Sequence, residues 1–317
     1  MNTSSRTVLV TGGAGFIGSH VCQTYRDAGW QVIALDNLSS GKLHNVPDGV
    51  EFVEMDIRSD ELSQYMQDRR PHLVNHHAAQ IDVRVSVADP RLDASINTDG
   101  WLNVLESARM AGVGRIIYVS SGGVVYGEPG QLPTGERAPK APISPYGVSK
   151  LSGEYYMFYY RKVHGLEGVA LRYSNVYGPR QDPHGEAGVV AVFCRRLLQG
   201  LNLTIFGNGE QTRDYVYVGD VAAANLAVSE LSISDPETID DVAFNVATGN
   251  EVSVCQLAET LLSVAGQQAD IEFAAARQGE LLRSSLDTAR LRAAGWAPEI
   301  DLTQGLGRTY EYIAEHL

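Results

Sequence analysis

Two features of the sequence predict an α/β fold, in which a parallel sheet is covered by helices on both faces. From Thr7 onward, short apolar runs rich in β-branched residues alternate with longer segments of helical period, which is typical of strand-helix-strand units. The hydrophobic fraction of 44% over 317 residues is that of a globular protein long enough for one large domain or two fused lobes.

The expected strands follow one another at regular intervals. They are residues 7–10, 31–36, 50–55, 72–77, 115–120 and 169–173. Between the fourth and the fifth, residues 92–112 place their apolar side chains roughly on one stripe of a helix, and Gly112 is a typical helix stop.

The pattern changes after Tyr173, where glycine and proline become frequent. We therefore predict a first domain over residues 1–175 and a smaller mixed α/β lobe over residues 176–317, with some segments exchanged between the two. In the second lobe we expect two strands around the Gly-Asn-Gly turn at 207–209, and helices near 253–265 and 302–315.

Charge and cysteine content exclude several classes of partner. The formal net charge of −13 lacks the basic footprint of a nucleic-acid-binding protein. Cys22, Cys194 and Cys255 are odd in number and widely spaced, which fits neither a disulfide framework nor a metal site. Because the N-terminus has no apolar signal segment and no run of about 18 apolar residues occurs, we expect a cytoplasmic protein with free thiols that binds no nucleic acid, membrane or metal.

A glycine-rich turn follows the first strand. Gly12, Gly15 and Gly18 have the spacing G-x-x-G-x-x-G before an amphipathic helix, where glycines permit a tight turn, the close approach of a pyrophosphate and close helix packing. The helix N-terminus also favours an anion. The turn indicates a dinucleotide site on a Rossmann-type doubly wound sheet.

Asp36 strengthens the dinucleotide interpretation. It ends the second strand, eighteen residues after Gly18, close to the separation of ~20 residues at which a carboxylate reaches the ribose hydroxyls. No arginine stands beside it, and a 2′-phosphate would be repelled, so we expect NAD rather than NADP as the cofactor. Asp56, Ala78 and Ala79 end later strands and are either further cofactor contacts or plain packing.

Tyr146 and Lys150 are the candidate catalytic pair. Ser144 can cap a helix that begins at Pro145, which puts Tyr146 and Lys150 one turn apart on the same face. A tyrosine titrates near pH ~10 in water, and a neighbouring ammonium would stabilise its phenolate. Tyr146 could then take a hydroxyl proton while a hydride leaves the same carbon for NAD. Ser121, which closes the fifth strand before two glycines, would share that proton.

These stretches together resemble a known family. The resemblance rests on TGGAGFIG, HAAQ, SSGGVVYG, SPYGVSK, LRYSNVYGPRQ and GEQTRDYVYVGDV, which are similar to motifs of the extended short-chain dehydrogenase/reductases, specifically the UDP-hexose 4-epimerases. It spans nearly the whole chain. It implies an isomerase with bound NAD, in which carbon 4 of a UDP-sugar is oxidised to a ketone, the ketosugar rotates, and hydride returns to its other face.

The resemblance also implies roles for individual residues. The catalytic set is Ser121, Tyr146 and Lys150. The cofactor contacts are Gly12, Gly15, Phe16, Ile17, Gly18, Asp36, Asn37, Ser39, Asp56, Ile57, Ala78, Ala79, Gln80, Asn97, Tyr146, Lys150, Tyr173 and Val176. The contacts to the UDP-sugar are Gln80, Ser121, Tyr146, Asn175, Val189, Phe206, Arg213, Arg277, Glu280 and Ser284.

The sequence departs from the family at one point. Many relatives have one residue fewer between the catalytic serine or threonine and the Tyr-Gly that follows it, which would align Gly122 with that position. Glycine has no hydroxyl to offer, and the spacing from Ser121 to Tyr146 fits the family, so we retain Ser121.

Ser284 favours an acetylated sugar. The resemblance places it where a tyrosine would crowd an N-acetyl group, whereas serine leaves room. We therefore expect UDP-N-acetylglucosamine and UDP-N-acetylgalactosamine as substrates, in addition to UDP-glucose and UDP-galactose.

Three other functions stay open. A UDP-glucuronate 4-epimerase would use Arg180 to meet the sugar carboxylate. A nucleotide-sugar 4,6-dehydratase would need an acid and a base where Gly122 and Gly123 stand. A non-catalytic NAD sensor would usually have lost Tyr146 or Lys150.

A homodimer is also expected. The resemblance implies a four-helix bundle built from the helices that contain Trp101 and residues 146–160. The run EYYMFYYRK is unusually aromatic for a solvated surface, which favours an interface, although core packing is the alternative.

Overall fold

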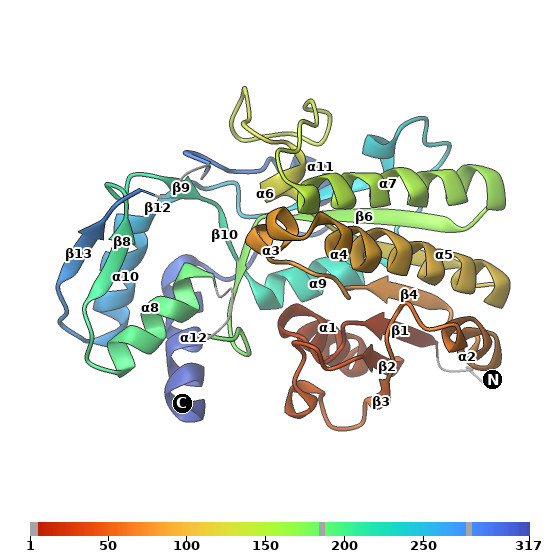
Figure 1. Cartoon of the computed structure of the whole chain (residues 1–317), viewed down its shortest axis with the longest axis horizontal. Coiled ribbons are helices and arrows are strands. Elements are labelled where there is room, and N and C mark those ends of the chain that lie inside the picture. Colours follow the sequence, from red (N-terminus) through yellow and green to blue (C-terminus); the bar gives the residue numbers. More distant parts are fainter. Residues whose placement is uncertain (1–5, 184–187, 277–280) are drawn as a thin grey trace.

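The structure is a computed structural model and describes residues 6–183, 188–276 and 281–317. At its centre, a seven-stranded parallel sheet has the order β11-β6-β5-β4-β1-β2-β3 (Figure 1). Its strands are β1 (Thr7–Thr11), β2 (Gln31–Asp36), β3 (Glu51–Glu54), β4 (Leu73–His76), β5 (Arg115–Ser121), β6 (Glu167–Tyr173) and β11 (Ala243–Val246). The predicted doubly wound sheet of the Rossmann type is confirmed.

Strand β11 was not predicted. It lies about 70 residues beyond β6 in the sequence, yet it pairs with β6 in parallel register. Its four residues, Ala-Phe-Asn-Val, are all buried, but they are too few to show a period and include a polar asparagine. The last strand of the central sheet therefore comes from residues 176–317.

Helices cover both faces of the sheet. On one face lie α1 (Phe16–Asp27) and α9 (Val218–Val228), which contact each other. On the other face lie α2 (Glu61–Arg69), α5 (Gly100–Ala111) and α7 (Pro145–His164). Each face has its own cluster of buried apolar side chains, as expected for a sheet wound on both sides.

The helical pattern predicted over residues 92–112 proves to be interrupted. After α3 (Val83–Ala88), the chain forms α4 (Pro90–Ala94), then a π-helical turn, η2 (Ser95–Asp99), and then α5. Gly112, with a φ of 70°, ends α5 as predicted. A π-helical turn inside a helix is frequently found at a functional site, and this one contains Asn97.

Elements outside the central sheet form a separate apolar core and small sheets. Helices α8 (Val189–Leu198), α10 (Val254–Ala265) and α12 (Leu302–His316) pack around one apolar cluster. Three two-stranded sheets pair β10 (Tyr215–Tyr217) with β7 (Asn175–Tyr177), β12 (Val252–Ser253) with β9 (Thr212–Arg213), and β13 (Ile271–Ala274) with β8 (Leu203–Phe206). The remaining short elements are η1 (Leu43–Asn45), α6 (Gly122–Val125), η3 (Ile239–Val242) and α11 (Ala289–Ala293).

The elements predicted within residues 176–317 are largely confirmed. The two helices near 253–265 and 302–315 are α10 and α12, and the two strands around the turn at 207–209 are β8 and β10. These strands do not pair with each other, because each finds a parallel partner elsewhere.

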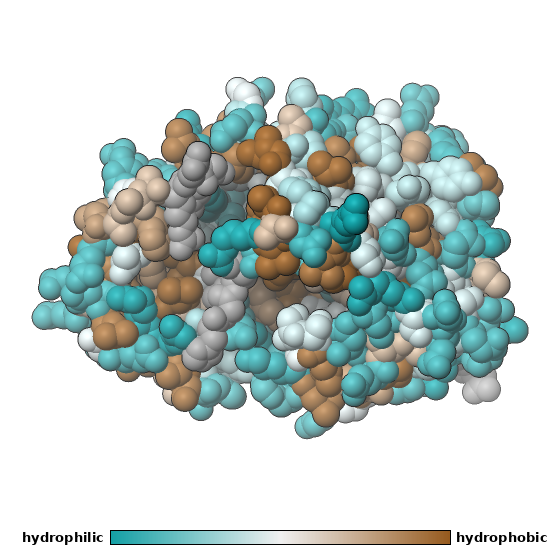
Figure 2. Space-filling model, viewed as in Figure 1, coloured by the Kyte–Doolittle hydropathy of each residue, from teal (hydrophilic) through white to brown (hydrophobic). Residues whose placement is uncertain are grey.

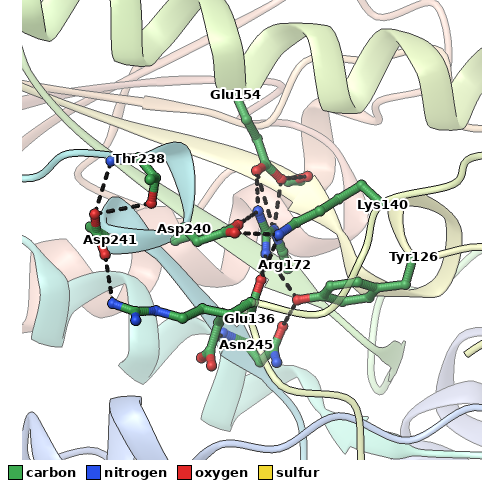
Figure 3. A network of polar contacts seen from close by, with 12 residues as sticks. Tyr126, Glu136, Lys140, Glu154, Arg172, Thr238, Asp240, Asp241 and Asn245 are labelled. Atoms are coloured by element: carbon green, nitrogen blue, oxygen red, sulfur yellow. Dashed lines mark hydrogen bonds and ion pairs between the residues drawn. The ribbon is translucent and has the colours of Figure 1, made fainter. Parts of the chain in front are cut away.

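A buried network of charges joins β6 to α7 and to η3 (Figure 3). Arg172 on β6 is fully buried, and its guanidinium donates to both carboxylate oxygens of Glu154 on α7, at 2.9 Å from Nε and 2.5 Å from Nη2. Nη2 also lies 2.8 Å from Asp240, whose other oxygen accepts from Lys140 at 2.5 Å. Each charge in this network thus has an opposite charge within hydrogen-bond distance.

The network gives a testable expectation for stability. Arg172→Met should lower the free energy of unfolding by about 3–5 kcal/mol, because it leaves the buried Glu154 carboxylate without its cation. Denaturant unfolding measures the change.

The matched control is Arg69→Met, which removes the exposed ion pair with Glu51 and should change the stability by less than about 1 kcal/mol. An Arg172→Met protein no less stable than the Arg69→Met protein would show that Glu154 does not depend on this partner.

Candidate active site

A large cavity lies at the carboxyl ends of β1, β2, β4 and β5, with a volume of about 700 Å³. The carboxyl ends of parallel strands around a change in strand order, here between β1 and β4, are where doubly wound folds bind ligands. In Figure 2, which has the same view as Figure 1, the surface of the molecule is hollowed near its centre. Most of the side chains predicted to form the site meet in this cavity.

The glycine-rich turn forms one wall. A Cβ on Gly18 would lie 2.1 Å from the Gly12 carbonyl oxygen, and a Cβ on Gly12, whose φ is 68°, would lie 2.7 Å from the Ala78 nitrogen. Side chains are therefore excluded at both positions. Helix α1 begins with Gly15 at its N-cap and has no side chain capping it, so its first backbone N–H groups can receive an anion.

Asp36 stands at the edge of this wall. Its carboxylate is almost fully buried and accepts hydrogen bonds from the Ala14 nitrogen, at 3.0 Å, and from the Leu38 nitrogen, at 2.9 Å. These bonds fix the side chain against the glycine turn while leaving acceptor sites on both oxygens. The residues present thus fit a dinucleotide, with a pyrophosphate at the N-terminus of α1 and ribose hydroxyls at Asp36.

The cavity brings together almost all of the predicted cofactor residues. Those that line it are Gly12, Gly15, Phe16, Ile17, Gly18, Asp36, Asn37, Ser39, Asp56, Ile57, Ala78, Ala79, Gln80, Tyr146, Lys150, Tyr173 and Val176. Asp56 is held by Arg58 and Asn37, with Asn37 Nδ2 at 2.9 Å, and hydrogen bonds from Arg58 hold the pKa of its carboxyl well below the usual range.

Asn97 lies behind the cavity wall and not in it. Its side chain donates to the Gln80 carbonyl at 2.8 Å and accepts from the Gln80 nitrogen at 2.9 Å. It is buried and fixes the segment of Gln80, which does line the cavity. The structure thus places Asn97 as a support for a cavity residue.

Helix α7 delivers the candidate catalytic pair, as predicted. The Ser144 hydroxyl caps it by accepting from the Gly147 nitrogen at 3.1 Å, and Pro145 is its first residue. Tyr146 and Lys150 both face the cavity, and the Lys150 Nζ lies 5.7 Å from the centre of the Tyr146 ring. The ammonium is held by the Val119 carbonyl at 2.9 Å.

Ser121 joins this pair at the end of β5. Both Ser121 and its neighbour Ser120 line the cavity, but the Ser120 hydroxyl donates to Glu154 at 2.6 Å. Gly122 is packed against Leu286, since a Cβ there would lie 2.4 Å from a Leu286 methyl carbon. Ser121 therefore stays the predicted catalytic hydroxyl, since Gly122 has no side chain and no room for one.

The titration behaviour of the pair differs from the simple expectation. Burial raises the pKa of Tyr146, and the negative charge of Asp93 adds to the rise. Burial lowers the pKa of Lys150 to about 8, against an opposing effect of Asp93. The spacing of the pair predicted that the ammonium would favour the phenolate, but desolvation of the phenol has the larger effect on the pKa of Tyr146 in the chain without cofactor.

Asp93 is one of the residues near the site that the sequence analysis did not identify. It is fully buried on α4 and accepts hydrogen bonds from Ser149 and Asn97. It lies near the start of the helix predicted over residues 92–112, where a polar side chain is ordinary, so no local signal pointed to it. His77, the residue immediately after β4, also lines the cavity, and its position at a strand end was the available signal.

A second, smaller cavity of about 210 Å³ shares one lining residue with the first. Its lining includes four of the predicted substrate residues, Asn175, Val189, Phe206 and Arg213. Asn175 is that shared residue, so both cavities reach the start of β7. Arg277 and Glu280 lie outside the described residues, and Ser284 is buried and lines neither cavity.

Arg180 lines the large cavity but is engaged with helix α1. Its guanidinium donates to Gln23 Oε1 at 2.7 Å and to Ser19 Oγ at 3.3 Å. Among the residues that the structure describes, no three His, Cys, Asp or Glu side chains cluster in a way that could hold a metal ion. No helix in the described part of the chain is both long and apolar enough to span a membrane.

Comparison with known proteins agrees with this geometry. UDP-glucose 4-epimerase from Thermotoga maritima, solved with UDP-glucose, has a TM-score of 0.93 and 42% identity, over 98% of this chain and 99% of that one. UDP-glucose 4-epimerase from Thermus thermophilus, solved with NAD, has a TM-score of 0.90 and 42% identity, over 98% and 100%. UDP-N-acetylglucosamine 4-epimerase from Methanobrevibacter ruminantium, in complex with UDP-N-acetylmuramic acid, has a TM-score of 0.91 and 33% identity, over 99% of each.

The family model that matches the chain covers residues 8–247. This range takes in the glycine turn, Asp36, the Ser121, Tyr146 and Lys150 set, and strands β1 to β11 of the central sheet. The chain belongs to the NAD dependent epimerase/dehydratase family.

Proposed function

We propose that this protein is a UDP-sugar 4-epimerase that uses tightly bound NAD. The observation that supports it best is the meeting of Tyr146, Lys150 and Ser121 in a cavity that also contains the glycine turn and Asp36. The substrates we propose are UDP-N-acetylglucosamine and UDP-N-acetylgalactosamine, together with UDP-glucose and UDP-galactose. A cytoplasmic location belongs to the same proposal, since Cys22, Cys194 and Cys255 are unpaired, as in a reducing compartment.

In the proposed mechanism, the chain supplies binding and proton transfer. NAD⁺, when bound in the large cavity, supplies the hydride acceptor for carbon 4 and a positive charge that favours the Tyr146 phenolate. Tyr146 takes the proton of the 4-hydroxyl and later returns it. Ser121 donates a hydrogen bond to the same oxygen, and Lys150 balances the charge on the phenol.

The smaller cavity is proposed to hold the nucleotide. Arg213 supplies a cation for a diphosphate, and Phe206 and Val189 supply apolar surface for a base. Because Asn175 lines both cavities, a UDP-sugar with its base in the small cavity would direct its hexose toward Tyr146.

The geometry favours this proposal over its rivals. A 4,6-dehydratase acid or base at Gly122 would collide with Leu286. The Arg180 guanidinium is bonded to Ser19 and Gln23, which turns it toward α1 and away from the role of binding a uronate. A sensor would have no need for Tyr146 and Lys150 at the wall of one cavity.

A homodimer is part of the proposal. On α7, Val148, Tyr155, Tyr159 and Val163 are exposed, and their spacing of seven, four and four residues puts them on one stripe. Trp101 of α5, by contrast, is fully buried, so it belongs to the core. An exposed aromatic stripe of this kind is typical of an interface.

The catalytic role of Tyr146 is tested with Tyr146→Phe. The change should lower kcat by about 10² to 10⁴-fold, because it removes the proton acceptor while keeping the ring. The bound NAD, measured after denaturation of the purified protein, should be unchanged. Tyr155→Phe, on the exposed face of the same helix, is the control and should behave as wild type; a Tyr146→Phe protein with comparable turnover would refute the assignment.

The substrate assignment is tested by incubating the wild type with each UDP-sugar and resolving the products. Ser284 is buried and lines neither described cavity, so its place beside the sugar rests on the family resemblance alone. If that place holds, Ser284→Tyr should lower kcat/KM for the acetylated pair by about 10- to 100-fold, because a larger side chain would crowd the acetyl group. The rates with UDP-glucose and UDP-galactose serve as the internal control. An equal loss for both pairs, or no turnover of the acetylated pair by wild type, would remove the acetylated sugars from the proposal.

The dimer is tested with the double variant Tyr159→Arg and Val163→Asp. We expect wild type to elute as a dimer and the variant as a monomer, because charges would be buried in the contact. Light scattering after size exclusion gives the masses. Leu201→Asp, at an exposed site elsewhere, is the control. A Tyr159→Arg and Val163→Asp protein that still elutes as a dimer would show that this stripe is not the interface.

A further inference from the structure

Asp93 is a buried carboxylate next to the site that no step proposed above uses. It is fully buried on α4. Its Oδ2 accepts from the Ser149 hydroxyl at 2.6 Å, and its Oδ1 accepts from Asn97 Nδ2 at 2.9 Å and from Gln80 Nε2 at 3.2 Å. It thus connects three segments: α7, the π-helical turn η2, and the Gln80 segment of the cavity wall.

All three donors to Asp93 are neutral. None of the ion pairs among the described residues involves it. Glu154, the other fully buried carboxylate on this face of the sheet, is instead matched by Arg172. Neutral donors leave a buried carboxylate without a counter-charge, and a nearby cation would stabilise its ionised form further.

The Lys150 ammonium likewise has no oppositely charged group among the hydrogen-bond partners that the structure describes. Lys150 follows Ser149 directly in α7 and is almost fully buried. Its ammonium donates to the neutral Val119 carbonyl at 2.9 Å and lies 5.2 Å from the Tyr118 ring and 5.7 Å from the Tyr146 ring.

The other titratable groups around Lys150 offer no net charge. They are Tyr146 and Glu154 on α7, Tyr118 on β5, His76 at the end of β4, and His77 directly after it. Burial raises the pKa of both tyrosines and lowers the pKa of both histidines, so these four are neutral near pH 7. Since Arg172 balances Glu154, Asp93 is the one carboxylate left in this group to balance the ammonium.

We propose that Asp93 is a positioning residue for the epimerase, acting as the buried counter-charge of Lys150 and tying α7 to the Gln80 segment through Ser149. This inference rests on the proposed function for its role in catalysis, but the charge pairing itself is a property of the folded chain. The Asp93 charge opposes the lowering of the Lys150 pKa by burial. It thereby favours the ammonium form of Lys150, which the proposed reaction needs.

The charge pairing is tested by nuclear magnetic resonance on protein labelled with ¹³C at the lysine ε-carbons. The chain has four lysines, Lys42, Lys140, Lys150 and Lys162, so the Lys150 signal can be assigned by its loss in Lys150→Arg. In Asp93→Asn, which keeps the shape of the side chain but removes its charge, the Lys150 titration midpoint should move to lower pH by roughly 0.5 unit or more. The Lys162 midpoint should stay where it is.

Asp99→Asn is the matched control. Asp99 is an exposed aspartate in the adjoining turn, and its change should leave the Lys150 midpoint in place. An unchanged Lys150 midpoint in Asp93→Asn would overturn the proposal. Neither outcome depends on turnover, so a failure here is distinct from a failure of the wild type to epimerise UDP-sugars.

Thermal unfolding supplies a second measurement, which uses Lys150→Met and the double variant and does not need the Asp93→Asn single variant. Lys150→Met should lower the Tm, because it leaves the Asp93 carboxylate buried without a cation. Adding Asp93→Asn to that variant should raise the Tm again. A double variant no more stable than Lys150→Met would show that the two charges are not coupled and would overturn the proposal.

Discussion

The burial of a single ammonium group, that of Lys150, is the constraint on which the site depends. The Lys150 side chain extends from α7 to the carbonyl of Val119 on β5. The helix that contains Tyr146 is therefore fixed against the carboxyl end of a central strand. The same strand ends in Ser121. A helix that slid along the sheet would lose this contact, and the hydroxyls of Tyr146 and Ser121 would no longer face one cavity.

The interior around α7 is correspondingly polar, and its charges are arranged in two groups. Toward β6 and η3, Arg172 matches Glu154 and Asp240. Toward α4, Asp93 has only neutral donors. Charged groups in a low-dielectric interior stabilise a fold only when opposite charges are paired. The Arg172 group contains its own opposite charges, whereas the Asp93 charge has none among its described hydrogen-bond donors and can act on Lys150.

Much of this arrangement was predictable from the sequence, for local reasons. Six strands of the sheet are apolar runs of ordinary length, the Gly12 to Gly18 turn has a fixed spacing, and Ser144 and Pro145 define the start of α7. The order of these features along the chain was enough to predict that Tyr146, Lys150 and Ser121 lie at the same edge of the sheet. Strand β11 was missed because its strand character depends on pairing with β6.

Asp93 was missed for a related reason, since its carboxylate becomes buried only because α7 packs over α4. Asn97 was predicted from the family resemblance as a cofactor contact, but its support of Gln80 from a π-helical turn was not, because such a turn has no sequence signature. The rise in the pKa of Tyr146 likewise follows from burial by segments distant in sequence. The local sequence pattern was thus enough to predict the reacting groups, whereas the charges and burial around them could be seen only in the folded structure.

The central claim is that the Tyr146 hydroxyl exchanges a proton with the sugar. A crystal structure with NAD and a UDP-hexose tests it most directly, through the distance between the Tyr146 Oη and the oxygen on carbon 4. The proposal predicts a hydrogen bond of about 2.6–3.2 Å, with Ser121 bonded to the same oxygen. A sugar seated with another of its hydroxyls at Tyr146, or a phenol directed out of the cavity, would contradict it.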